Sequence, residues 1–116
     1  MIIRESTSGT HRALLAEMGK HSITFDDMDI CLEVGNSEAI VKAVEVGFGV
    51  SFVSRLAADW ALDKGTVVEV PVADFDLRRK VYLIRSDVHE PHRASEAFWG
   101  FVHDPRNTDL LRLAER

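Results

Sequence analysis

The fold is decided by one stretch, Ile2-Ile3-Arg4-Glu5-Ser6-Thr7-Ser8-Gly9-Thr10-His11-Arg12-Ala13, which runs from an apolar, β-branched segment straight into a polar turn. Leu14, Leu15 and Met18 follow at spacings that place them on one face of a helix. The stretch therefore predicts a short strand, a hydroxyl-rich turn and a helix from about Gly9 to Gly19.

The hydroxyl-rich turn, the 6–10 loop, is a candidate anion site. If Ser8 is the N-cap, the amides of Gly9, Thr10 and His11 lack intrahelical partners and point outward, with the positive end of the helix dipole behind them. That arrangement suits a carboxylate or another oxyanion. The alternative is that these residues only cap a helix, as every helix start requires.

Strands and helices are expected to alternate along the next part of the chain. The turn Gly35-Asn36-Ser37 ends an expected strand at 28–34 and opens a helix with Asn36 or Ser37 as N-cap. Gly47 is expected to end that helix in the left-handed conformation. The remaining expected elements are a strand at 50–53, a helix from Ser54 to Leu62 carried by Leu56, Ala57, Trp60 and Ala61, and a strand at 66–72.

This alternation, with its short joints, favours an α/β fold made of βαβ units around a mainly parallel sheet with flanking helices. Every strand-to-helix joint then emerges at the same edge of the sheet, which is where open α/β sheets bind ligands. The 6–10 loop, the 35–37 loop and the turn at 53–54 should therefore lie along one edge, which strengthens the anion-site interpretation. The candidate ligand-binding residues are Ser6, Thr7, Ser8, Gly9, Thr10, Gly35, Asn36, Ser37, Val53 and Ser54.

The end of the chain has a different character. A charged segment at 74–80 is expected to connect to a strand at 81–85, and Pro91 suits the first turn of a further helix. Asp104-Pro105 should end that helix, and 107–116 is either a short docked helix or a frayed tail. The apolar face of the helix is expected to consist of Ala94, Ala97, Phe98, Phe101 and Val102.

The composition is that of an ordinary globular domain, with 116 residues of which 46% are hydrophobic and 28% charged. The net charge is -5 and no run of Lys and Arg stands out, so a DNA-gripping surface is not expected. No apolar stretch is long enough to span a bilayer, and the N-terminus lacks the order of a signal peptide. We therefore expect a cytoplasmic protein with no membrane partner.

Catalytic residues, metal ligands and cofactors are not expected. The five histidines form no metal-ligand pattern, although His11 lies near enough to the 6–10 loop to bind an effector if it is not simply solvated. Cys31 is the single cysteine, which indicates a reducing compartment, and we expect it to be a packing residue because no base lies near it. A small α/β enzyme using Ser6, Ser8 or Cys31 with a histidine is a weaker alternative.

Three motifs follow one another along the chain: Arg4-Glu5-Ser6-Thr7-Ser8-Gly9-Thr10, Leu32-Glu33-Val34-Gly35-Asn36-Ser37-Glu38-Ala39-Ile40 and Ala43-Val44-Glu45-Val46-Gly47-Phe48-Gly49-Val50-Ser51-Phe52-Val53-Ser54, followed by Gly65-Thr66-Val67-Val68-Glu69-Val70-Pro71-Val72 and Leu77-Arg78-Arg79. In this order they resemble the effector-binding domain of LysR-type transcriptional regulators. The likeness continues to the closing strand and helix, so it covers nearly the whole chain.

The resemblance implies a type-II periplasmic-binding-protein-like fold, in which two α/β subdomains joined by a hinge hold a small-molecule effector between them. Capped helix ends favour an organic anion as that effector, whereas hydroxyl-rich loops also suit a neutral polar ligand. The loops at 6–10, 35–37 and 53–54 would form one wall of the cleft. The implied divisions are a second subdomain at 1–72, a hinge at 73–80, the returning strand and helix of the first subdomain at 81–103, and a C-terminal tail at 104–116.

In such regulators, effector binding changes how the subunits of a homo-oligomer are arranged, and hence how attached winged helix-turn-helix domains sit on DNA. No helix-turn-helix segment precedes Met1 and most of the first subdomain is missing, so we expect a piece of a longer protein or a fragmentary reading frame. Because this chain would supply only one wall of the cleft, we expect it to bind the effector weakly. A transport-type solute-binding protein shares the fold, but the missing signal segment argues against it.

The helix after Pro91 would lack its usual cover in this chain, since it packs on the missing half in the family. We therefore expect self-association through Phe98, Phe101 and the edge of the strand at 81–85. The alternative is that this helix folds back on its own sheet.

Overall fold

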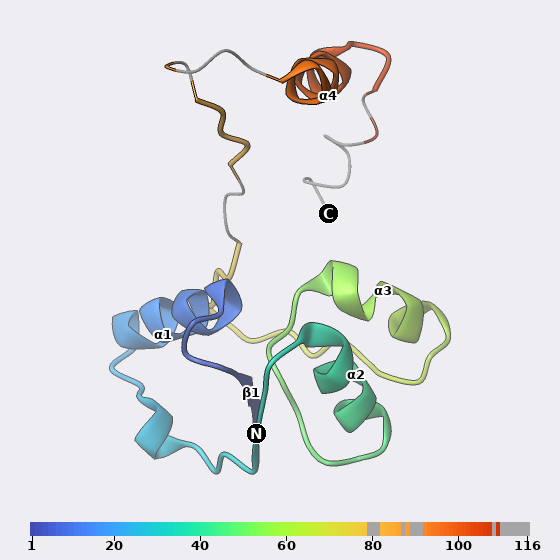
Figure 1. Ribbon diagram of the computed structural model, residues 1–116. Coiled ribbons are helices and arrows are strands. Elements are labelled where there is room, and N and C mark those ends of the chain that lie inside the picture. The colour runs from blue at the N-terminus through green and yellow to red at the C-terminus, as the bar shows by residue number, and fades with distance from the viewer. Residues whose placement is uncertain (79–81, 87, 89–91, 108, 110–116) are drawn as a thin grey trace. The chain divides into compact units, whose positions relative to one another are not determined.

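A computed structural model describes residues 1–78, 82–86, 88, 92–107 and 109. The chain forms two compact units, Met1–Arg79 and Lys80–Arg116. The first unit contains β1 (Ile2–Arg4), α1 (Gly9–Lys20), the 3-10 helix η1 (Phe25–Asp27), β2 (Leu32–Val34), α2 (Ser37–Glu45) and α3 (Arg55–Asp63), and the second contains α4 (Arg93–His103) (Figure 1).

A small parallel sheet lies at the centre of the first unit. β1 pairs with β2 in a register that sets Ile2 beside Leu32 and Arg4 beside Val34. On its other side, β1 meets the chain at Ser51 through an isolated parallel bridge, and the Ile2 amide donates to the Val50 carbonyl at 2.8 Å. The predicted α/β fold with parallel pairing is confirmed for this unit, and β1 is its central strand.

Helices α1 and α2 lie on opposite sides of β1 (Figure 1). The chain crosses from β1 to β2 through α1 and returns past β1 to Ser51 through α2. Because parallel crossovers are right-handed, two crossovers in opposite directions place their helices on opposite faces of the sheet. The connections that leave β1 and β2 therefore diverge at the sheet edge.

The core is formed where these helices cover β1. Ile2, Met18 and Ile40 are fully buried, one from each of β1, α1 and α2. A second apolar cluster, between α2 and α3, consists of Val41, Ala58 and Ala61, with Val53, Leu62 and Val67 packed against it. The apolar helix faces expected from the sequence are only partly buried. Leu15 of α1 and Leu56 and Trp60 of α3 were expected on those faces, but they are exposed.

Several expected strands are absent or shorter than predicted. The strand expected at 28–34 is confined to β2, and the one expected at 50–53 is reduced to the bridge at Ser51. Residues 66–72 form no strand, and Val68 and Val70 are 80% and 70% exposed. β-branched composition favours a strand, but an extended segment becomes one only when a neighbour satisfies its backbone groups.

The helix boundaries follow the sequence more closely than the strands do. α1, α2 and α3 begin and end within a residue or two of their expected positions. Gly47, with a φ of 82°, supplies the left-handed residue predicted after α2. Gly65, with a φ of 68°, does the same after α3.

The second unit contains one described helix, α4. The helix starts after His92, so it begins beyond the Pro91 expected in its first turn, and it ends before Asp104, as the sequence predicts. Residues 82–85 form no strand, whereas Val81, Pro91 and most of 107–116 lie outside the described residues. Phe98 and Phe101 on α4 are 54% and 52% exposed.

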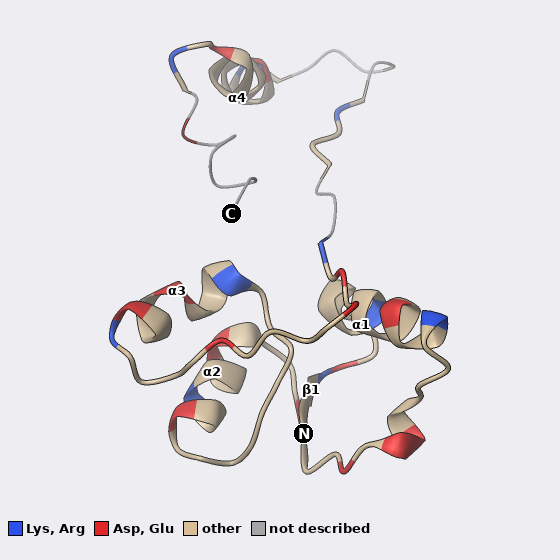
Figure 2. Ribbon diagram, turned by 180° about the vertical axis from the view of Figure 1, so that it is seen from behind, with Lys and Arg blue, Asp and Glu red and all other residues tan. Residues whose placement is uncertain are grey.

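Charge is mixed on the helices of the first unit. Each of α1, α2 and α3 carries both signs (Figure 2), so none of them presents the uniformly basic face that grips a nucleic-acid backbone. In the part of the chain that the structure describes, no helix combines the length and apolar character needed to cross a membrane.

Candidate functional site

The candidate site lies at the edge of the sheet where β1 and β2 end. Arg4 and Val34 are the paired last residues of these neighbouring strands, and the 6–10 and 35–37 loops lead from there to α1 and α2. Because α1 and α2 lie on opposite faces, the two loops diverge from adjacent strands. Such a divergence is the topological switch point at which open α/β sheets bind ligands.

Ser8 caps α1 as the sequence predicts. Its hydroxyl oxygen accepts a hydrogen bond from the Thr10 amide at 3.1 Å, and its own amide donates to the Glu5 carbonyl at 2.9 Å. The Thr10 amide is therefore occupied, which corrects the expectation that three first-turn amides are open. The amides of Gly9 and His11 still lack intrahelical partners, as the geometry of a helix start requires.

Asn36 caps α2 in the same way. Its side-chain oxygen accepts from the Ala39 amide at 2.7 Å, and Ser37 is the first residue of the helix. Of the two N-cap residues that the sequence allowed, Asn36 and Ser37, the structure therefore selects Asn36. The amides of Ser37 and Glu38 are the ones that the helix leaves without intrahelical partners.

Arg4 joins the two loops. Its Nη1 donates to the Ser37 hydroxyl oxygen at 3.0 Å, and its Nη2 donates to the Gly35 carbonyl at 3.2 Å. These contacts cross more than 30 residues of sequence and bring the end of β1 against the start of α2. The end of β1, from which the 6–10 loop leaves, therefore lies beside the 35–37 loop.

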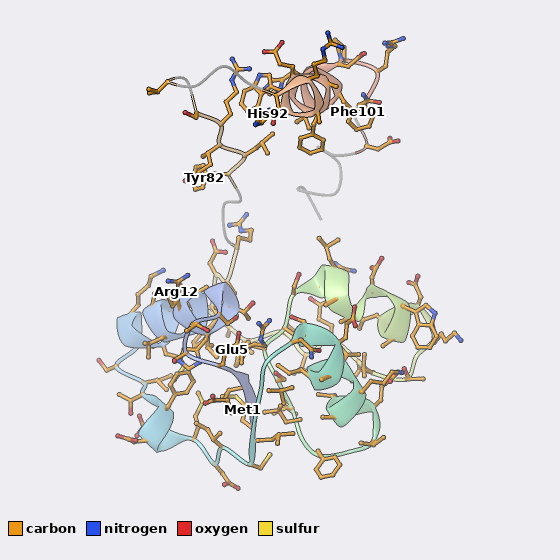
Figure 3. All side chains as sticks on the ribbon, in the orientation of Figure 1. Met1, Glu5, Arg12, Tyr82, His92 and Phe101 are labelled. Carbon is orange, nitrogen blue, oxygen red and sulfur yellow. The ribbon has the colours of Figure 1, made fainter. Side chains whose placement is uncertain are left out.

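Glu5 binds the other side of the same guanidinium group. Its two carboxylate oxygens accept from Arg4 Nε and Nη2, both at 2.8 Å, in a bidentate pair. The hydrogen bonds from Arg4 lower the pKa of the Glu5 carboxyl and raise the pKa of Arg4. Figure 3 shows Glu5 between α1 and α2.

Arg4 and Glu5 were not among the predicted site residues. A charged pair directly after an apolar, β-branched run was the available signal, since the run places the pair at the end of a buried strand. Only the parallel register of β1 and β2 shows that the Arg4 side chain reaches the 35–37 loop.

The remaining predicted site residues differ in their surroundings. Ser6, Thr7, Gly35 and Asn36 are exposed, and Gly9, Thr10 and Ser37 are half-buried. His11 lies against the ring of Phe25 at 4.8 Å, and its Nδ1 donates to the Arg4 carbonyl at 2.7 Å. That hydrogen bond fixes the imidazole beside the 6–10 loop.

The turn at 53–54 follows the bridge at Ser51. Val53 packs against the cluster between α2 and α3. Ser54 is the N-cap residue of α3, but its side chain makes no capping hydrogen bond. Polar contacts hold the other two loops together, whereas apolar packing holds Val53.

Cys31 is exposed, so the expectation of a packing cysteine is wrong. Its sulfur lies 3.5 Å from the carbonyl oxygens of Met1 and Phe48. Within the described residues, His, Cys, Asp and Glu side chains form no group that could hold a metal ion.

Residues 1–105 match the family described as the LysR substrate binding domain. The chain is 36% identical over 101 residues to an uncharacterized HTH-type transcriptional regulator of Methanocaldococcus jannaschii, covering 87% of this chain and 34% of the relative. It is 35% identical over 108 residues to the uncharacterized HTH-type transcriptional regulator YeiE of Escherichia coli, covering 91% of this chain and 35% of the relative.

A third relative has a different name. It is the phosphonates import ATP-binding protein PhnC of Anaeromyxobacter dehalogenans, 33% identical over 95 residues, which are 82% of this chain and 19% of that protein. The chain thus spans about a third of the length of the two regulators and less of the transport protein. No solved structure matches the chain significantly.

Proposed function

Because this chain belongs to the LysR substrate-binding domain family, a family of transcriptional-regulator domains rather than of enzymes, we propose that it is the effector-sensing part of a LysR-type regulator. Its ligand would be a small organic anion at the edge where β1 and β2 end. The observation that carries this proposal is the pair of Arg4 hydrogen bonds to Ser37 and Gly35, which tie the end of β1, just before the 6–10 loop, to the capped start of α2.

The proposed ligand contacts come from exposed or half-buried groups of the two loops. The hydroxyls of Ser6, Thr7 and Ser37 and the amides at the starts of α1 and α2 offer donors to a carboxylate. The turn at Val53 and Ser54 would line the same wall. No metal ion or cofactor enters this proposal.

The proposed domain divisions are those of the family's hinged fold. Residues 1–72 would be the second subdomain and 73–80 the hinge, with 81–103 belonging to the first subdomain and 104–116 forming a tail. An effector would favour one of two arrangements of an oligomer, and winged helix-turn-helix domains outside this chain would carry the change to DNA in the cytoplasm.

Binding by this chain alone should be weak, because these loops supply one wall of a two-walled cleft. We expect dissociation constants no tighter than about 1 mM, or roughly -4 kcal/mol. Titration of the chain with a panel of organic acids, followed by amide chemical shifts of Gly9 and Gly35, tests both site and affinity. Micromolar binding would refute the half-cleft argument, and unmoved loop amides would refute the site.

A solute-binding protein of a transport system is the second candidate, and the similarity to a protein named for phosphonate import is the observation in its favour. The two functions differ in what accompanies this domain. A coding segment for a helix-turn-helix domain directly upstream would support the regulator, whereas an upstream secretion signal would support the transport protein.

A further inference from the structure

A carboxylate of the chain itself already occupies the sheet edge where the end of β1 lies beside the 35–37 loop. Both oxygens of Glu5 accept hydrogen bonds from Arg4 at 2.8 Å. The guanidinium that binds them also donates to Ser37 and to Gly35. Among these acceptors only Glu5 is negatively charged, so it is the one that an incoming carboxylate could replace.

We propose that Arg4 receives the carboxylate of an anionic effector and that Glu5 is the resident carboxylate that the effector displaces. This inference rests on the proposed function and names the charge partner of its ligand. Arg4 suits the role because its planar fork binds a carboxylate through two parallel hydrogen bonds.

The position of Arg4 does not depend on Glu5 alone. The Gly35 carbonyl and the Ser37 hydroxyl hold Nη2 and Nη1 from the side of α2. If Glu5 moves away, these two contacts keep the guanidinium at the sheet edge. The fork that Glu5 vacates, made of Nε and Nη2, is the part that can then bind a second carboxylate.

Glu5 is able to leave because the pair is only partly removed from water. The side chains of Arg4 and Glu5 are 16% and 30% exposed, so water still reaches the pair and weakens the attraction between the two charges. A displaced Glu5 can be hydrated at the start of the 6–10 loop. The additional negative charge of the effector would then be balanced by the positive ends of the α1 and α2 dipoles.

Exchange of this kind makes Glu5 a determinant of affinity and selectivity. A neutral ligand cannot compete with Glu5 for Arg4, and an anion must bind Arg4 more favourably than Glu5 does. Removal of the Glu5 charge should therefore strengthen the binding of an anion. A structural ion pair with no ligand role predicts no such gain.

The test is a titration of the isotope-labelled 116-residue chain with sodium acetate at constant ionic strength, with acetamide as the neutral ligand of similar shape. The resonances followed are the Arg4 Nε–H group and the amides of Gly9 and Gly35. Glu5→Gln should bind acetate about tenfold more tightly than the parent, and Arg4→Gln about tenfold more weakly. Acetamide should leave the Arg4 resonance unchanged.

Two further variants act as controls. Glu33→Gln makes the same charge change at an exposed position on β2 and should bind acetate as the parent does. Arg4→Lys keeps the positive charge without the fork, so it should bind acetate with an affinity between those of the parent and Arg4→Gln. If Arg4→Gln does not fold, weaker acetate binding by Arg4→Lys than by the parent tests the role of the Arg4 fork instead.

The outcomes separate this inference from the proposed function. If acetate moves the loop amides but Glu5→Gln binds it no more tightly, the exchange is wrong and the loop site stands. If acetate moves the Gly9 and Gly35 amides in none of the variants, the anion site fails together with the exchange.

Discussion

Glu17 Oε1 accepts a hydrogen bond from the backbone amide of Asp76 at 3.2 Å, which ties α1 to the segment that leaves the first unit. His21 adds to this attachment, because its Nε2 donates to the Asp74 carbonyl at 3.0 Å and its ring stacks on Phe75 at 4.9 Å. The helix that follows the 6–10 loop thus holds the exit segment at its other end.

Replacement of Glu17 should release that segment. Glu17 is 5% exposed, and its other oxygen binds Lys20 Nζ at 2.5 Å, so Glu17→Ala removes two contacts at once. We expect faster hydrogen exchange of the Asp76 amide, because its acceptor is gone. Glu17→Gln keeps an acceptor oxygen and should retain more protection, and equal exchange in all three proteins would contradict the attachment.

The stability of the chain should fall in acid. Hydrogen bonds from Lys20 and then from the Asp76 amide lower the pKa of Glu17 below its ordinary 4.5, and the hydrogen bonds from Arg4 lower that of Glu5. The unfolded chain then binds protons more readily than the folded one. These contributions are therefore present above about pH 4.5 and are lost as the pH falls through the lowered values.

Urea unfolding between neutral pH and about pH 3 measures this dependence. The Glu17→Gln variant lacks one of the titrating groups, so its free energy of unfolding should change less over the same range. A steeper decline in Glu17→Gln than in the parent would contradict the assignment.

The N-cap residue of α2 should contribute more to the free energy of unfolding than the N-cap residue of α3 does. Asn36 accepts a hydrogen bond from the Ala39 amide, whereas the Ser54 side chain makes no capping bond. Asn36→Ala should therefore cost about 1 kcal/mol of unfolding free energy. Ser54→Ala is the matched control and should change the free energy far less, so equal losses would show that the observed hydrogen bond is not the cause.

Gly47 should resist substitution. Its φ of 82° lies in the left-handed region, and Gly47→Ala should cost about 1 kcal/mol because a Cβ is disfavoured there. A methyl group on Gly19, inside α1, would meet no atom within 4 Å, so Gly19→Ala should stabilise the helix by about 0.5–1 kcal/mol. Urea denaturation of the two variants should show a lower free energy of unfolding for Gly47→Ala and a higher one for Gly19→Ala.

Self-association through α4 remains a prediction. Phe98 and Phe101 are about half exposed on this helix, and burial of such a side chain contributes about 1.5–3 kcal/mol. Sedimentation should show association that weakens in a Phe98→Ser, Phe101→Ser double variant. Leu15→Ser, on the exposed face of α1, is the control, and a parent chain that stays monomeric at high concentration would end this proposal.

The sequence by itself determined the helices, the cap of α1 and the family. Ser8 and Gly47 act through a hydrogen bond or a backbone angle within a few residues, so local spacing is enough to place them, whereas the choice between Asn36 and Ser37 needed the structure. The order of the motifs also determined that the 6–10 and 35–37 loops follow parallel strands.

The tertiary structure decided which extended segments became strands and what lies between the loops. Residues 66–72 have the composition of a strand but lack a paired neighbour, and pairing is a property of distant segments. Arg4 reaches Ser37 only because the register of β1 and β2 sets their ends side by side. A contact across 33 residues depends on that register, which local patterns do not contain.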